Sequence, residues 1–126
     1  MITEDYVSFE TAKLLKEKGF TENCLMRYNK AGGLVEESYK FNWNFQTIDY
    51  SAPTLQMVMK WLREKYNIVI SIIFISDQKR EDRNSYSWIV YTADTFKWNT
   101  KEAEKSQVSY ELACEAAIRY CLENII

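Results

Sequence analysis

Residues that could perform chemistry are few in this sequence, and none of them forms a catalytic set. The chain contains no histidine. It therefore lacks the commonest general base, the usual partner of a serine or cysteine nucleophile, and the commonest zinc ligand. Only three glycines are present, with Gly32 and Gly33 adjacent, so neither a Walker-type phosphate loop nor a dinucleotide fingerprint is formed. The sequence predicts a non-enzymatic protein without a cofactor or a metal site.

The cysteines and the paired carboxylates are the remaining groups with reactive potential. Cys114 and Cys121 are seven residues apart on one predicted helix, so about 10 Å separates them along its axis, too far for a disulfide. Cys24 lies near a predicted strand start, where a buried thiol fills core space. Neighbouring carboxylates such as Glu36 and Glu37 could serve a metal-free glycosidase, but no spacing selects a pair. We interpret the thiols as reduced and the carboxylates as solvated surface.

Aromatic residues are the unusual feature of the composition, with four tryptophans, nine tyrosines and six phenylalanines. Most are expected in the core. Met57 and Trp61 form an i,i+4 pair that lies about 120–160° away from the apolar arc of their predicted helix. Either another element covers this pair, or it is an interface anchor for a protein partner. Leu112 and Leu122 fall in the polar arc of the last predicted helix and raise the same question.

A second aromatic group lies on the predicted strands. Trp43, Trp88 and Trp98 could line a pocket for a small molecule or a glycan, closed by the charged loop at 77–84. This alternative function requires the three rings to meet on one side of a sheet.

Nucleic-acid binding is a more distant alternative. Lys79, Arg80 and Arg83 stand near aromatic residues, as in some binders of single strands. However, the net charge is −2 and the pI is about 5.3, whereas nucleic-acid binding usually requires a basic domain or stripe. The sequence therefore disfavours a nucleic-acid partner.

The residues from 51 to 75 contain the clearest structural signals. Pro53 suits a first helical turn, and Ser51 or Thr54 can cap the free amides. Asn67 is suited to a left-handed helix end. The apolar period predicts a helix on a core, with one buried arc formed by Leu55, Val58, Met59, Leu62 and Tyr66.

The strand that follows this helix is predicted to be central in its sheet. Ile68 to Ile75 contains no charged residue and one polar residue, so both of its faces are apolar. Such a run is typical of a strand covered on both sides.

The first half of the chain predicts a helix followed by a hairpin. The helix covers 8–18 and ends at Gly19, and the hairpin turn lies at 29–33 after a short strand at 23–28. Aromatic and polar residues alternate strictly over 39–46. This alternation predicts a strand with four large rings on one face of the sheet.

The second half predicts two further strands and a final helix. A charged loop at 76–84 precedes a strand at 86–91, which a segment at 95–98 extends. Ser109 caps the last helix. A solvated stripe with a Glu115–Arg119 ion pair is expected on that helix, formed by Glu111, Glu115, Arg119 and Glu123.

Together these elements predict one α+β domain over residues 1–126. The order α-β-β-α-β-β-(β)-α suggests a two-layer sandwich, with three helices packed chiefly on one side of an antiparallel sheet of four to five strands. The opposite sheet face would then expose more apolar area than a monomer usually shows. The odd number of cysteines, the acidic N-terminal residues and the short apolar runs favour a cytoplasmic protein with no membrane partner.

Two stretches resemble a known family. These are APTLQMVMKWLRE at 52–64 and SYELACEAAIRYCLE at 109–123, and the segment 7–20 is also similar. Together they resemble small uncharacterised proteins of gut anaerobes and of their phages or mobile elements. The resemblance implies an intracellular setting and brings no activity or site residue with it.

The favoured hypothesis is a small, non-enzymatic accessory protein that binds another protein or itself. It rests on surplus apolar surface combined with the lack of a catalytic set. A homodimer would bury this surface on the open sheet face or at Met57 and Trp61. The small-molecule or glycan binder and the single-strand binder remain as alternatives.

Overall fold

The computed structural model describes residues 1–76, 85–93, 96–98 and 107–126. Within these ranges the chain contains three α-helices, one 3₁₀-helix and six strands, which confirms the mixed α+β class. Their order is α1 (Phe9–Glu17), β1 (Cys24–Tyr28), β2 (Leu34–Phe41), η1 (Trp43–Phe45), β3 (Tyr50–Ser51), α2 (Leu55–Tyr66), β4 (Val69–Ile75), β5 (Ser85–Tyr91), β6 (Phe96–Trp98) and α3 (Tyr110–Asn124).

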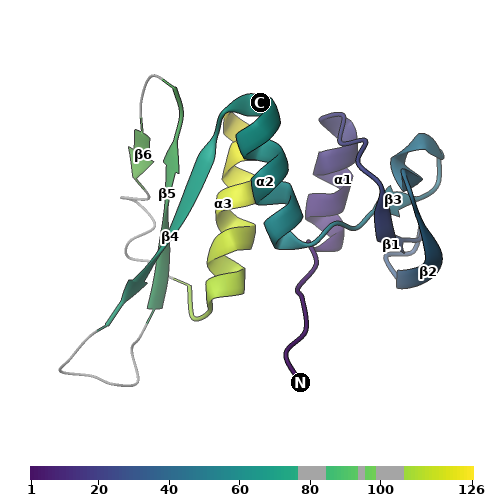
Figure 1. The fold of residues 1–126 in the computed structure, drawn as a ribbon, viewed down its shortest axis with the longest axis horizontal. Helices are drawn as coiled ribbons and strands as arrows, with labels where there is room; N and C mark the ends of the chain where they lie inside the picture. Colours follow the sequence, from purple (N-terminus) through teal and green to yellow (C-terminus); the bar gives the residue numbers. More distant parts are fainter. Residues whose placement is uncertain (77–84, 94–95, 99–106) are drawn as a thin grey trace.

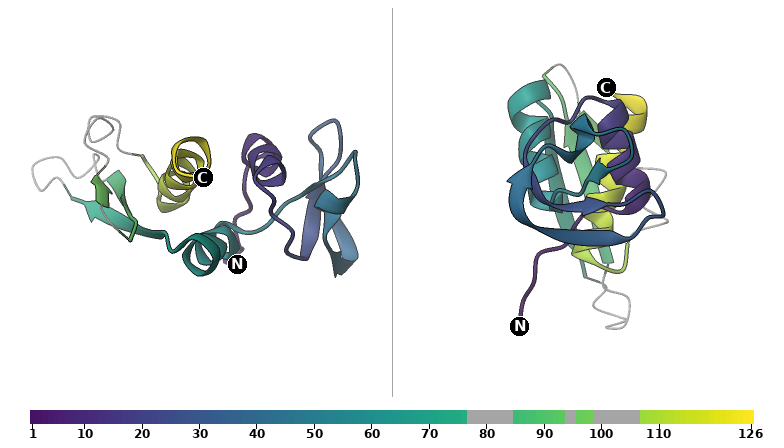
Figure 2. Two further views of the ribbon diagram at one scale, coloured as in Figure 1. Left: turned by 90° about the horizontal axis from the view of Figure 1, so that it is seen from above. Right: turned by 90° about the vertical axis from the view of Figure 1, so that its right-hand side faces the viewer.

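The strands form two separate antiparallel sheets, so the predicted single sheet is wrong. The first has the order β2-β1-β3 and the second β4-β5-β6. The helices lie between the sheets: α1 packs against β3, and α3 packs against β4 and β5 (Figure 1). Viewed from above, the sheets stand at the two ends of an elongated molecule with the helices between them (Figure 2). The layer of helices therefore packs against both sheets.

Local side chains define the helix boundaries where the sequence predicts them. The Ser8 hydroxyl accepts a hydrogen bond from the amide of Thr11, and Thr54 does the same for Met57 at the start of α2. Ser109 caps α3. Asn67 ends α2 in the left-handed conformation, with φ of 56°, a region in which asparagine is favoured among residues with a side chain.

The core is continuous across the three helices and reaches both sheets. The predicted arc of α2 is confirmed, since Val58 and Leu62 are fully buried and Tyr66 packs against the core from its edge. From α3, the core receives the fully buried side chains of Ala113, Cys114, Ala117, Ile118, Cys121 and Leu122. No helix within the described ranges is both long enough and apolar enough to cross a membrane.

The aromatic strand predicted over 39–46 ends early. β2 stops at Phe41, and the chain turns into η1, where the Asn42 side chain accepts a hydrogen bond from the amide of Asn44. The Asn44 side chain in turn donates to the carbonyl of Phe20. Asparagines that bond the backbone locally compete with strand pairing. The rings consequently point in different directions, because Trp43 is buried whereas Phe45 is 81% exposed.

The predicted polar stripe of α3 is also modified. The Glu115 carboxylate leaves the stripe and accepts hydrogen bonds from Ser8 and Thr11 at the start of α1. Arg119 pairs with Glu123 instead, at 3.0 Å. The expected Glu115–Arg119 pair is therefore wrong, because the positive end of a neighbouring helix offers the Glu115 carboxylate several donors at once.

Candidate interaction surfaces

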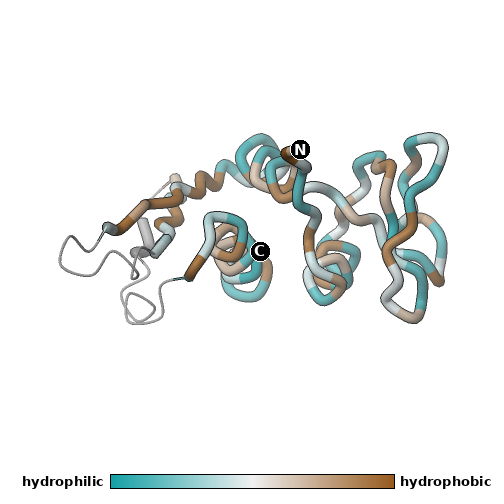
Figure 3. Tube along the Cα trace, turned by 90° about the horizontal axis from the view of Figure 1, so that it is seen from below, coloured by the Kyte–Doolittle hydropathy of each residue, from teal (hydrophilic) through white to brown (hydrophobic). Residues whose placement is uncertain are grey.

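Several apolar side chains of β4 are exposed, and this strand lies at the edge of the second sheet. β5 occupies the central position, with β4 and β6 on either side, so the prediction of a central strand at Ile68 to Ile75 is wrong. Every second residue of an edge strand directs its backbone N–H and C=O away from the sheet. β4 contains seven residues without a charge, and it is hydrophobic apart from Ser71 and lies at one end of the molecule (Figure 3).

The two faces of β4 differ in what covers them. Ile70 and Ile72 pair with Val90 and Trp88 on β5, and the Trp88 ring lies 5.1 Å from that of Tyr120 on α3. This face therefore points toward the helices. Alternation places the following residues on the opposite face: Val69, Ser71, Ile73 and Ile75.

Exposure along β4 is greatest at its two ends. Val69 is 41% exposed, Phe74 53% and Ile75 38%, whereas Ile70 is 7% exposed. Natural edge strands usually carry charges, prolines or bulges that discourage pairing with another chain. β4 has none of these features in its seven residues and pairs regularly with β5 over its whole length.

The Met57 and Trp61 pair lines a groove on α2, but Trp61 is not an exposed anchor. Its indole is 6% exposed and packs edge-on against Phe20 and Tyr66, with ring centroids 5.1 and 5.2 Å away. Phe20 follows α1 in the chain, so another element covers Trp61, the first of the two predicted alternatives. Met57 remains partly exposed.

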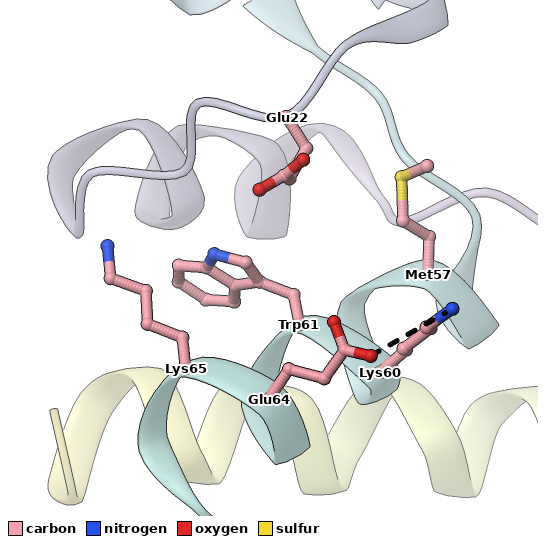
Figure 4. A pocket seen from close by; sticks show the side chains of 6 residues that line it. All are labelled: Glu22, Met57, Lys60, Trp61, Glu64 and Lys65. Atoms are coloured by element: carbon pink, nitrogen blue, oxygen red, sulfur yellow. Dashed lines mark ion pairs between the residues drawn. The ribbon is translucent and has the colours of Figure 1, made fainter.

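The groove beside Trp61 measures about 450 Å³ and is lined by residues of both charges. Lys60 pairs with Glu64 at 4.0 Å, the Lys65 ammonium lies 5.6 Å from the Trp61 ring centroid, and Glu22 approaches from the opposite wall (Figure 4). The indole N–H faces this groove and has no hydrogen-bond partner among the described residues. Because the charges balance, this lining selects neither an anion nor a cation.

The two leucines of α3 have opposite environments. Leu112 is 47% exposed, whereas Leu122 is fully buried. The interface assignment of Leu122 is therefore wrong. In the C-terminal half of α3, the buried side of the helix includes a position that the sequence pattern assigns to the polar side. Leu122 belongs to the same buried cluster as Cys121.

The predicted tryptophan pocket is not assembled. Trp43 follows β2 in the first sheet, and its indole N–H donates to the carbonyl of Cys24 at 2.7 Å. Trp88 lies on β5 of the second sheet and is 5% exposed. The two sheets stand at opposite ends of the molecule (Figure 1), so these rings cannot share one ligand. The side chain of Trp98, the loop 77–84 and its three basic residues lie outside the described residues.

The thiols are buried and show no sign of activation. Burial raises the pKa of Cys24 and of Cys121 to about 12, and that of Cys114 to about 11. Reactive cysteines require a lowered pKa. The described part of the chain also contains no cluster of three or more cysteine and carboxylate residues able to hold a metal ion.

A second exposed apolar site, missed by the sequence reasoning, lies on the loop between β2 and β3. Phe45 and Ile48 are 81% and 59% exposed. The loop is attached to α1, because the Lys16 ammonium donates hydrogen bonds to the carbonyls of Gln46 and Asp49 at 2.6 and 2.8 Å. A signal for this loop was present in its asparagines, which favour turns over strands.

Comparison with known proteins gives no relative. The chain matches none of the family models, curated proteins or solved structures with which it was compared. The resemblance of segments 52–64 and 109–123 to proteins of gut anaerobes and their phages stays a prediction.

Proposed function

We propose that this protein acts by binding another polypeptide chain and not by catalysis, with the edge of β4 as its binding surface. The observation that carries this proposal is the exposed, charge-free edge strand. In strand addition, a partner segment pairs with the free backbone groups of a sheet edge, and its alternate side chains meet the pockets beside that edge. An accessory role inside the cell, as in phages or mobile elements, belongs to the same proposal.

The second sheet is prepared for this mode of binding. Trp88 and Val90 are buried on its central strand, which anchors β5 firmly against α3. β4 is in turn paired with β5 along seven residues. A rigid edge lowers the entropic cost of adding a strand, because only the partner segment has to be ordered.

A soluble strand peptide tests the proposal directly. The probe is a fluorescein-labelled copy of residues 68–75 with lysines added at both ends, and fluorescence anisotropy measures its binding to the purified protein. We expect saturable binding. We also expect binding to be weakened at least tenfold, on the order of 1.4 kcal/mol, by Ile73→Lys, since a charge in the middle of an edge strand opposes pairing.

The matched control is Phe45→Lys, which places the same charge on an exposed apolar residue of the loop before β3. It should bind the peptide as the wild type does. Circular dichroism establishes that both variants are folded. Absence of binding to the folded wild type, or equal binding by the Ile73→Lys variant, would contradict strand addition at β4.

A further inference from the structure

We infer that the strand completing the second sheet is β4 of a second copy of this chain, so that two sheets join edge to edge into one sheet across a two-fold axis. This inference rests on the proposed function, because it names the partner of the same edge. Two identical strands related by such an axis are necessarily antiparallel, and the resulting interface is isologous. The combined strand order is β6-β5-β4-β4-β5-β6.

The sequence of β4 selects one register for this pairing. With seven residues, the register that uses the whole strand places the axis at Ile72. Val69 then lies opposite Ile75 of the partner subunit, and Ile70 lies opposite Phe74 of the partner subunit. Residues directly opposite each other point to the same face and are the pairs that stabilise a sheet.

This register brings the exposed ends of β4 together. Val69 and Ile75, which are 41% and 38% exposed, cover each other twice on the face away from the helices. Phe74, 53% exposed, comes beside Ile70 on the helical face. The three most exposed side chains of β4 thus all lie in the proposed interface. A shift of the register in either direction would leave an end of the strand unpaired.

Charge also favours a second copy. Identical strands that pair across a two-fold axis bring like residues close together, so any charge near the centre would repel its own copy. β4 is uncharged throughout. Its free backbone groups and β-branched side chains are therefore self-complementary. A pairing of seven residues on each strand is short in comparison with the interfaces of permanent dimers, and we expect a reversible, concentration-dependent association.

Sedimentation equilibrium on the full chain tests the inference over a concentration series from about 1 µM to about 1 mM, a range that spans weak to moderate affinity. We expect the weight-average mass to rise from 15.0 kDa toward twice this value. The double variant Val69→Lys with Ile75→Lys places lysines directly opposite each other at both ends of the interface. It should weaken association at least tenfold.

A charge swap makes the test specific for the register. Val69→Lys combined with Ile75→Glu places opposite charges across both ends of the same pairing, and it should restore association relative to the double-lysine variant. Because both positions are partly exposed, both variants should fold, which circular dichroism checks. Phe45→Lys, on the segment between β2 and β3 of the first sheet, serves as the control with unchanged association; β2 and β3 lie at the end of the molecule away from β4 (Figure 1).

The outcomes separate this inference from the proposed function. A wild type that stays monomeric throughout the series while still binding the strand peptide would overturn the dimer and leave strand addition to a different partner. A dimer that both double variants preserve would overturn the β4 register. A chain that neither dimerises nor binds the peptide would overturn both proposals.

Discussion

Both sheets of this protein pack apolar side chains into the core, but within the described residues only the first sheet adds side-chain ion pairs. In the first sheet, Arg27 on β1 bonds to Glu37 at 2.8 Å and to Asp49 at 3.1 Å, and the Tyr28 hydroxyl donates to the carbonyl of Val7 at 2.6 Å. In the second sheet, β4 and β5 are attached to α3 mainly by apolar side chains such as Ile72 and Trp88. No ion pair involves β4 or β5 within the part of the chain that is described.

This difference accompanies a difference in surface, because the long edge strand β4 of the second sheet carries no charge. Hydrogen bonds and ion pairs depend on geometry and therefore fix the conformation of particular loops. In the first sheet, those made by Lys16 and Arg27 hold the segment before β3 in place. The hydrophobic effect is not directional and requires only that apolar area be covered. In the second sheet it attaches the helical face to α3 and leaves the backbone groups at the edge of β4 unpaired within the described residues. Four sets of variants distinguish the two kinds of stabilisation.

Removing a large side chain from the apolar sheet should cost the most. Trp88→Ala empties a buried site beside Tyr120, and the free energy of unfolding should fall by about 3–5 kcal/mol. Urea unfolding followed by circular dichroism measures the change. The control is Val108→Ala, because Val108 is 81% exposed and should change stability by less than about 0.5 kcal/mol. Equal effects of both variants would contradict apolar packing as the main force.

Removing the cation of the first sheet should have an intermediate effect. Arg27→Ala leaves Asp49, whose side chain is only 10% exposed, without its ionic partner. Stability should fall by about 2 kcal/mol, a value lowered from that of fully buried pairs because Arg27 itself is 21% exposed. The comparison variant is Arg63→Ala on the exposed side of α2. If high salt leaves the cost of Arg27→Ala unchanged, the electrostatic description of this sheet is wrong.

The link between α1 and α3 should contribute less. Glu115→Gln removes the charge that accepts hydrogen bonds from Ser8 and Thr11. Stability should fall by about 1 kcal/mol, the usual contribution of a charge at a helix end together with its hydrogen bonds. Glu111→Gln on the exposed side of α3 is the control. Indistinguishable thermal midpoints for the two variants would show that the Glu115 carboxylate does not stabilise α1.

The smallest effect is the pH dependence at Cys24 in the first sheet. Its pKa is raised from 9.0 to about 12, so the folded state keeps a proton that the unfolded state loses. The contribution is fully present well below pH 9 and declines as the pH rises through 9 toward 12. At pH 9 the loss is about 0.4 kcal/mol. Urea unfolding at pH 7 and at pH 9 should show that the wild type loses about 0.4 kcal/mol more stability than the Cys24→Ala variant. Equal losses in the two proteins would show that the pKa of Cys24 is not raised in the folded state.

Local structure was predictable because its causes lie within a few residues. Ser8, Thr54, Ser109 and Asn67 determine helix ends through contacts one turn away. The turn at 29–33 is likewise present, and Gly32 adopts a φ of +88° there. These features depend on backbone groups that any such sequence leaves unsatisfied.

The partition into two sheets was not predictable in the same way. Whether β4 pairs on one side or on two depends on strands far away in the sequence, and an apolar strand is compatible with either. The sequence could not distinguish a covered Trp61 from an exposed interface anchor, because only the fold brings Phe20 into contact with its ring. Glu115 was misplaced for a similar reason, since its partners lie more than 100 residues away.

The contact between α1 and α3 has a consequence for the order in which the molecule forms. α3 follows every other described element in the chain, yet it packs against α1, α2 and the second sheet. The helical faces of β4 and β5 are therefore covered by α3 only after the residues of α3 have been synthesised. Contacts of such long range slow folding and prolong the exposure of apolar strands. Until α3 docks, these apolar faces therefore stay uncovered.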